Sequence, residues 1–298
     1  MKASSGVSNS KFKGWISLLV AVVGVSWASI FVVLSSAPGV VCAFWRLTFS
    51  SILTWLALMA IERRVKFVLN HLFLTFISGL FLAAHFAFWM ESLFMVPVAI
   101  STTIVCSHPL FSSFLGFMVM GEKPRIIQLA GSIIAILGLL LLVTSTSQLA
   151  GELGLLGVVY ALIGALTVAA YFTIGKFLRR KLNTLTYTAL VYSWATLAIL
   201  MYALILHVDL IGYDLKSWFA FLALAFIPML LGHTMLNYAL KYFSLIAVTT
   251  VTLGEPVGAS LLAMMILGEQ CDVITYFSIT ITLVGIALTL FGERDGEA

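Results

Sequence analysis

Two stretches of this chain repeat one pattern of residues. The segments His85–Glu122 and His233–Glu269 each run from a histidine, through an apolar stretch and a proline, to a closing Gly-Glu pair. The two histidines lie 148 positions apart and the two prolines, Pro109 and Pro256, lie 147 apart, so one residue is gained or lost between them. A spacing of this kind predicts a duplicated architecture, with one copy of the pattern in each half of the chain.

The composition restricts the chain to the membrane. Hydrophobic residues make up 62% of the 298 residues, charged residues make up 9%, and the mean hydropathy is +1.13. A soluble domain needs a more polar surface than this, so we expect a polytopic membrane protein without a separate soluble domain. Cys42, Cys106 and Cys271 have no metal-site or CxxC spacing. We interpret them as packing residues, and we expect neither a metal nor another cofactor.

Apolar windows long enough to cross the hydrocarbon core, about 20 residues each, predict ten transmembrane helices. The windows cover residues 15–34, 39–60, 71–92, 97–119, 126–145, 154–175, 184–206, 217–239, 246–267 and 273–291. We expect the first window to be a retained helix, because it is too long for the hydrophobic region of a signal peptide. The predicted fold class is therefore an all-α membrane protein.

The basic residues predict how the ten helices are oriented. With both termini in the cytoplasm, the cytoplasmic segments hold 14 of the 16 Lys and Arg, and the outer loops hold only Lys216. The cytoplasmic set comprises Lys2, Lys11, Lys13, Arg63, Arg64, Lys66, Lys123, Arg125, Lys176, Arg179, Arg180, Lys181, Lys241 and Arg294. The net charge of +4 is thus explained by topology in a plasma (inner) membrane, and we expect the lipid bilayer rather than a nucleic acid as a partner.

The helix count also fixes the relation between the halves. We place them at residues 14–146 and 153–292, with five helices in each. Because five is odd, the second half enters the membrane with the opposite orientation, so two inverted repeats are expected to surround a central cavity. Inverted repeats are a recurrent plan of secondary transporters, with the substrate site near the middle of the bilayer.

Several short motifs, in order and in duplicate, resemble the EamA family of the drug/metabolite transporter superfamily, and the resemblance extends from Gly14 to Gly292. They are Pro38 followed by Ala43-Phe44-Trp45-Arg46, Pro97-Val98-Ala99, His108-Pro109 leading to Gly121-Glu122, Leu253-Gly254-Glu255-Pro256-Val257 leading to Leu267-Gly268-Glu269, and the glycines Gly131, Gly138 and Gly285. The resemblance implies a basket-like bundle, with a cavity lined by the first four helices of each half. It also implies export or exchange of small metabolites, often amino acids.

Five ionisable residues in the predicted spans stand out as candidates: Arg46, His85, His108, His233 and Glu255. Such groups are costly in lipid and normally face protein or water. His108 and Glu255 occupy equivalent mid-depth positions in the two copies, and His85 and His233 form a second pair. Glu255 could bind a substrate ammonium or carry a proton, or it could cap the broken backbone beside its proline. The histidines could line the cavity or make interhelical hydrogen bonds only.

Arg46 has two open interpretations. It could hold a substrate carboxylate through its planar guanidinium. Alternatively it could pair with Glu91 or extend toward the membrane surface, and we favour this structural role because the resemblance implies an arginine near a helix end, where such an extension costs little. Glu91 itself is expected near the outer interface, in contact with solvent.

The remaining candidates are aromatic, amide and proline residues. Trp27, Trp89, Tyr171 and Asn237 complete the predicted cavity, although aromatic side chains in a membrane bundle usually serve packing. Pro109 and Pro256 are expected to kink their helices, either as static bends or as hinges. The spacing of Gly254 and Gly258 is typical of close helix–helix packing.

We therefore expect a secondary transporter of small organic metabolites, amino acids or related amphipathic compounds, that works by alternating access. The chain has no Walker A motif, so we do not expect ATP to drive transport directly. Transport could be coupled to protons, or it could be facilitated diffusion. The alternative within transporters is an antiporter of a larger anionic solute such as a nucleotide or sugar phosphate. An intramembrane enzyme is less consistent with the sequence, because HExxH and GxSxG motifs are absent. A receptor or scaffold is also less consistent with the sequence. A monomer and a homodimer are equally compatible with the sequence.

Overall fold

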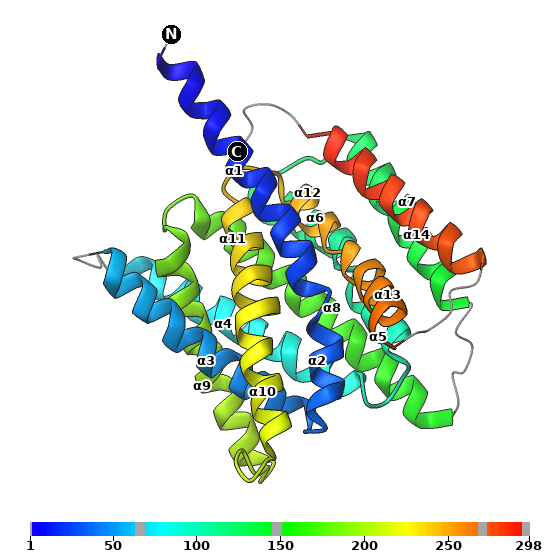
Figure 1. Ribbon diagram of the computed structural model, residues 1–298. Coiled ribbons are helices and arrows are strands. Elements are labelled where there is room, and N and C mark those ends of the chain that lie inside the picture. Colours follow the sequence, from blue (N-terminus) through cyan, green and yellow to red (C-terminus); the bar gives the residue numbers. More distant parts are fainter. Residues whose placement is uncertain (1, 63–68, 145–150, 268–272, 294–298) are drawn as a thin grey trace.

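The computed structural model describes residues 2–62, 69–144, 151–267 and 273–293, and over these ranges every regular element is a helix (Figure 1). The elements are α1 (Lys2–Val25), α2 (Ala28–Ser35), α3 (Gly39–Ile61), α4 (Leu69–Ser92), α5 (Val98–Val105), α6 (His108–Met120), α7 (Ile126–Thr144), α8 (Gly151–Arg179), α9 (Thr184–Ile205), α10 (Leu215–Leu224), the π-helix η1 (Ala225–Thr234), α11 (Met235–Ala239), α12 (Leu245–Val251), α13 (Gly254–Leu267) and α14 (Val273–Phe291).

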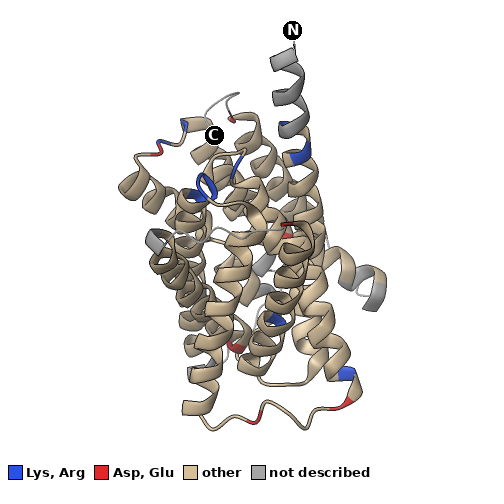
Figure 2. Ribbon diagram, turned by 90° about the vertical axis from the view of Figure 1, so that its left-hand side faces the viewer, with Lys and Arg blue, Asp and Glu red and all other residues tan. Residues whose placement is uncertain are grey.

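Within the described ranges, nine helical segments are long and apolar enough to cross a membrane, and Ile126–Leu141 in α7 is a shorter apolar helix. Four of the nine segments combine consecutive elements, namely α1 with α2, α5 with α6, α10 with η1 and α11, and α12 with α13. The prediction of an all-α membrane protein is thus confirmed. Charged residues lie mostly toward the two ends of the bundle, and the middle carries few of them (Figure 2). Large apolar side chains such as Phe73 and Phe277 are exposed around the outside, as lipid contact requires.

Helices α7 and α14 pack against each other at one side of the bundle (Figure 1). A β-carbon on Gly131 would lie 2.6 Å from the backbone nitrogen of Thr289, and one on Gly138 would lie 2.7 Å from that of Thr282. On the facing helix, a β-carbon on Gly285 would clash with the backbone of Ala135. Backbone contact of this kind is open only to glycine, so these positions allow the two helices to pack closely.

Three of the membrane-crossing segments are divided near the middle. Between α5 and α6, Cys106 and Ser107 keep right-handed helical angles while the hydrogen bonds shorten to i→i−3, and Pro109 follows at the start of α6. Thr252 makes the same kind of turn between α12 and α13, and Glu255 and Pro256 follow it three and four residues later. Each division is therefore a kink through a short 3₁₀-type turn rather than an unwound segment.

The third division, between α1 and α2, has no proline. The hydroxyl of Ser26 donates to the carbonyl of Val22 at 2.7 Å, and a serine bonded in this way bends a helix. A β-carbon on Gly258 would clash with the Ser26 side chain, and one on Gly254 would lie 2.8 Å from Val22. These two glycines therefore seat α13 against the bend in α1, in the packing role that their spacing predicts.

The segment that contains η1 differs from the unbroken helix α4. In η1 the hydroxyl of Thr234 donates to the carbonyl of Met229, five residues earlier, at 3.2 Å. Pro228 lies inside this segment and cannot donate a backbone hydrogen bond. The π-helix ends one residue after His233, and the spacing of the sequence repeat changes from 148 to 147 between His233 and Pro256.

The end of the bundle near the chain termini, here called the terminal end, is closed by carboxylates bound to backbone N–H groups (Figure 1). Glu122 accepts a hydrogen bond from the N–H of Leu245 at 2.6 Å. Glu293 accepts from the N–H of Ser244 at 2.7 Å, and its other oxygen accepts from the Ser244 hydroxyl at 2.5 Å and from Gln128 at 3.1 Å. The first residues of α12 are thus tied to α6, α7 and the residues after α14.

Two cations bind the other side of the same turn. Lys176 donates to the carbonyls of Leu240 at 3.0 Å and Phe243 at 2.7 Å, and Arg179 donates to the carbonyl of Asn237 at 2.9 Å. We had assigned Lys176 and Arg179 to a cytoplasmic connection, but both lie in α8 and are only 1% and 3% exposed. They are buried because the carbonyls at the end of α11 have no helical partner and accept their hydrogen bonds instead.

The opposite end, here called the distal end, is closed mainly by neutral groups. The indole of Trp45 donates to the carbonyl of Leu210 at 2.7 Å, and its ring packs edge-on against Trp218 at 4.6 Å between centroids. The hydroxyl of Ser217 donates to the carbonyl of Ser35 at 2.6 Å. These contacts join α2 and α3 to the loop before α10 and to α10 itself.

Candidate functional site

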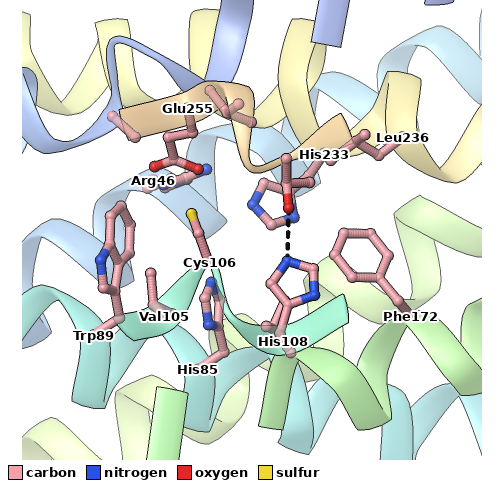
Figure 3. Close-up of a pocket in the computed structure, with 14 residues that line it drawn as sticks. Arg46, His85, Trp89, Val105, Cys106, His108, Phe172, His233, Leu236 and Glu255 are labelled. Atoms are coloured by element: carbon pink, nitrogen blue, oxygen red, sulfur yellow. Dashed lines mark hydrogen bonds between the residues drawn. The ribbon is translucent and has the colours of Figure 1, made fainter. Parts of the chain in front are cut away.

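A small buried chamber lies among the helices of the bundle, with a volume of about 20 Å³ (Figure 3). All 14 residues that line it are buried. They are Val25, Ala28, Arg46, His85, Trp89, Val105, Cys106, His108, Val168, Phe172, His233, Leu236, Thr252 and Glu255.

The divided helices supply much of this lining. Val25 and Ala28 flank the bend between α1 and α2, Cys106 and His108 border the turn between α5 and α6, and Thr252 and Glu255 border that between α12 and α13. The unbroken helices α3, α4 and α8 and the end of the π-helical segment complete the wall. A kink exposes polar backbone and side chains toward the bundle interior, which is where a membrane protein can tolerate them.

An arginine and a glutamic acid border the chamber. Arg46 is fully buried, and Glu255 is 9% exposed, toward this chamber. The two groups interact electrostatically, and in Figure 3 both lie on the same side of the cavity. Among the described residues, the three guanidinium nitrogens of Arg46 have no hydrogen-bond partner, and the group lies 4.2 Å above the ring of Phe86. An unpaired cation is costly in such surroundings, so this site favours an anionic or acceptor ligand.

The structural alternatives for these two residues do not match the geometry. The side chain of Glu91 accepts from the N–H of Gly39 at 3.2 Å at the distal end, and within the described ranges no ion pair joins it to Arg46. Since Arg46 is 0% exposed, its side chain does not reach the membrane surface either. The carboxylate of Glu255 makes no hydrogen bond to the backbone beside Pro256 in the described part of the chain.

The three histidines line the chamber from different helices. Nδ1 of His85 lies 3.0 Å from the carbonyl oxygen of Gly164, and Nε2 of His108 lies 2.8 Å from the hydroxyl of Thr252. Nδ1 of His233 and Nδ1 of His108 have no hydrogen-bond partner among the described residues. The centroids of the His85 and His233 rings are 6.0 Å apart, so the imidazoles form one cluster.

Aromatic rings separate these polar groups. Trp89 stacks parallel to His85 at 5.8 Å, and Phe172 stacks against both His233 at 5.9 Å and His108 at 5.6 Å. A wall with a few polar groups on an apolar surface suits an amphipathic ligand.

Three predicted cavity residues do not belong to the lining. Asn237 donates to the hydroxyl of Tyr171 and, at 2.7 Å, to the carbonyl of His233. Both side chains are fully buried behind the wall and hold the helix that carries His233. Trp27 lies at the bend between α1 and α2, half-buried, and stacks on Phe31 at 5.4 Å.

The sequence analysis did not include Cys106, Thr252 and Phe172 among the predicted cavity residues. Cys106 and Thr252 could have been found from their positions beside the prolines, where a kink directs side chains inward. Phe172 had no signal that separated it from the other aromatic residues of its helix. No cluster of metal-ligating side chains occurs within the described ranges. Cys271 and Glu269 lie outside the described residues.

Comparison with known proteins gives one family and one fold. The sequence profile of the EamA-like transporter family matches the chain twice, over residues 14–144 and 155–291. An uncharacterised transporter of Clostridium kluyveri is 21% identical over 201 residues, which cover 66% of this chain and 65% of that protein. The chain thus matches less than two thirds of the length of this relative. A crystal structure superposes with a TM-score of 0.76 at 17% identity, and the match covers 95% of this chain and 98% of that one, a likeness of fold.

Proposed function

The chain belongs to the EamA-like transporter family, and from this premise we propose that it exports or exchanges small amphipathic metabolites, amino acids among them, by alternating access. The observation that carries this proposal is that a basic and an acidic side chain, Arg46 and Glu255, line one buried chamber. An α-amino acid carries a carboxylate and an ammonium on neighbouring atoms, and this pair can receive both.

The proposed roles follow from the contacts of each side chain. Arg46, with its nitrogens unpaired, receives the carboxylate through two parallel hydrogen bonds. Glu255, which lacks a backbone partner, receives the ammonium. The stacked rings of Trp89, His85 and Phe172 provide apolar surface for the rest of the substrate.

The architecture supports a transport cycle. Each end of the bundle is held by its own hydrogen bonds, and a small chamber lined only by buried residues is what we expect of an intermediate between outward and inward access. We further propose that the two matched halves are inverted repeats in a plasma membrane, with both termini in the cytoplasm. Opening then alternates between the terminal end and the distal end.

A larger anionic solute fits this chamber less well. Several cations would be needed to receive a nucleotide or a sugar phosphate, and among the described residues the lining contains only Arg46. We therefore retain the amino-acid class as the proposed substrate.

Counterflow in proteoliposomes tests the proposal. Radiolabelled L-leucine and a panel of other amino acids are exchanged by wild-type protein, Glu255→Gln and Arg46→Gln. Each substitution is expected to reduce exchange by about tenfold or more, because it leaves one substrate charge unpaired in a desolvated site. Glu91→Gln is the matched control, since the amide keeps an acceptor for the N–H of Gly39. Unchanged exchange by Glu255→Gln would remove Glu255 from the mechanism. A proton gradient imposed on the same vesicles separates proton coupling from facilitated diffusion.

A further inference from the structure

The contact between His85 and Gly164 fixes which nitrogen of the imidazole carries its proton. Nδ1 lies 3.0 Å from the carbonyl oxygen of Gly164, and a carbonyl can only accept a hydrogen bond. Nδ1 must therefore be the donor. A β-carbon on Gly164 would lie 3.2 Å from that of Trp89, so glycine allows α8 to approach α4 closely enough for this bond.

The opposite nitrogen of His85 is consequently an acceptor. In a neutral imidazole with its proton on Nδ1, Nε2 carries a lone pair and no hydrogen. His85 and Arg46 line the same buried chamber, so protonation of His85 would add a second buried positive charge to one that is already unpaired. Nε2 has no hydrogen-bond partner among the described residues, although His85 lines the chamber.

The ring of His85 is also held in orientation. It is bonded to Gly164 on one side and stacked parallel to Trp89, with an angle of 5° between the planes. In Figure 3 it reaches into the chamber from the wall opposite to Glu255. Two acceptors, one neutral and one anionic, thus face the same space from opposite sides.

His108 contrasts with this arrangement. The hydroxyl of Thr252 donates to the carbonyl of Thr249 at 2.6 Å, so it accepts from Nε2 of His108. The remaining nitrogen, Nδ1, is buried without a partner and out of reach of the cavity space. Of these two histidines, His85 alone presents a free lone pair to a ligand.

We infer that His85 determines specificity, by accepting an N–H of the substrate ammonium at Nε2 while Glu255 accepts another. This inference rests on the proposed function. It names the ligand group more narrowly, as an ammonium with at least two N–H donors. A quaternary ammonium has the same charge but no donor, and it would leave both buried acceptors unpaired.

A series of ligands with constant charge tests this assignment. L-leucine and its N-methyl, N,N-dimethyl and N,N,N-trimethyl derivatives carry three, two, one and no N–H groups. They compete with radiolabelled leucine in counterflow by wild-type protein, His85→Phe, His85→Gln and the control His71→Phe, which lies on the same helix outside the chamber lining.

Wild-type protein and His71→Phe are expected to bind the trimethyl derivative at least about tenfold more weakly than leucine, with the loss growing along the series. In His85→Phe the difference in binding between leucine and its trimethyl derivative should shrink to a few-fold. In His85→Gln it should be partly restored, because the amide oxygen is again an acceptor. Equal competition by all four compounds in wild-type protein, or an unchanged series in His85→Phe, would overturn the inference. Failure of leucine itself to compete would overturn the proposed substrate class as well, so the two failures are distinguishable.

A spectroscopic measurement tests the protonation directly. In protein labelled with ¹⁵N-histidine, the resonances of His85 are identified by their loss in His85→Gln. We expect a protonated Nδ1 and an unprotonated Nε2. A protonated Nε2 would contradict the acceptor role, whatever the transport assay shows.

Discussion

The two ends of the bundle are closed by different chemistry. At the terminal end, the turn that precedes α12 is bound by Glu122, Glu293 and Lys176, all of which contact its backbone. At the distal end, Trp45 and Ser217 make neutral hydrogen bonds to carbonyls, supported by stacked rings. Both closures include hydrogen bonds to backbone atoms, so part of their geometry depends on helix position rather than on the side chains of the partner.

This difference predicts different costs of opening. When the terminal end opens, its charged groups become strongly hydrated. When the distal end opens, its aromatic rings lose apolar contacts and gain little from hydration. A hydrogen bond that involves a charged group contributes roughly 1.5–3 kcal/mol, and a neutral one about 1 kcal/mol. Opening of the terminal end should therefore change when its charged side chains are substituted or the ionic strength is raised. Opening of the distal end should change when its aromatic side chains are substituted.

Cys106 offers a native reporter for both ends, because it lines the chamber and is buried. With Cys42→Ala and Cys271→Ala in the background, its labelling by a small membrane-impermeant thiol reagent measures opening toward the side of addition. Vesicles of both orientations then report the two ends separately.

The largest effect is expected from Glu122→Ala combined with Glu293→Ala. The N–H groups of Leu245 and Ser244 lose their partners in the closed state only, at roughly 1.5 kcal/mol each, so labelling from the terminal end should rise on the order of a hundredfold. Glu62→Ala is the matched control, since this carboxylate binds only the side chain of Asn183 at the same end. Equal acceleration from both sides would show that the two closures are not independent.

A smaller effect is expected from Trp45→Phe. The ring contact with Trp218 is retained while the hydrogen bond to the carbonyl of Leu210 is lost, at about 1 kcal/mol. Labelling of Cys106 from the distal side should rise about fivefold, with no change from the terminal side. Trp218→Phe, which removes no hydrogen bond of the described closure, serves as control. A rise confined to the terminal side would reverse our assignment of this contact.

The smallest effect is expected from salt. Raising the ionic strength tenfold screens the partly buried carboxylates only slightly, so labelling from the terminal end should increase by less than about twofold. Labelling from the distal end, where the bonds made by Trp45 and Ser217 to carbonyls are neutral, should change less than labelling from the terminal end. A salt response of the distal end alone would contradict the division into charged and neutral closures.

Hydropathy and charge spacing predicted the helical fold well, because spans of fixed length are imposed by the bilayer. The windows 71–92 and 273–291 match described spans in the structure to the residue. The bend at Ser26 was not predicted, since no proline marks it and it depends on a serine hydroxyl and on the approach of Gly258. The burial of Lys176 was also missed, because sequence shows the charge but not the free carbonyls that surround it.

The candidate site was predictable in part, for a related reason. Ionisable residues in an apolar span stand out, and Arg46, His85 and Glu255 border the chamber. Aromatic residues do not stand out in the same way in a chain that contains many of them. The sequence therefore did not distinguish Phe172, which lines the chamber, from Tyr171, which does not and instead accepts a hydrogen bond from Asn237. Sequence spacing could not place them, because their position depends on how α8 is turned against its neighbours.

The π-helix η1 has a consequence for which residues border the chamber. Its hydrogen bonds span one residue more than those of an α-helix, and one residue corresponds to a rotation of about 100° about the helix axis. Everything after it, including Leu236 and Asn237, is turned by that step. Reversion of η1 to α-helical register would swing these side chains around the axis without unfolding the segment, so the register of one helix sets the face that it presents.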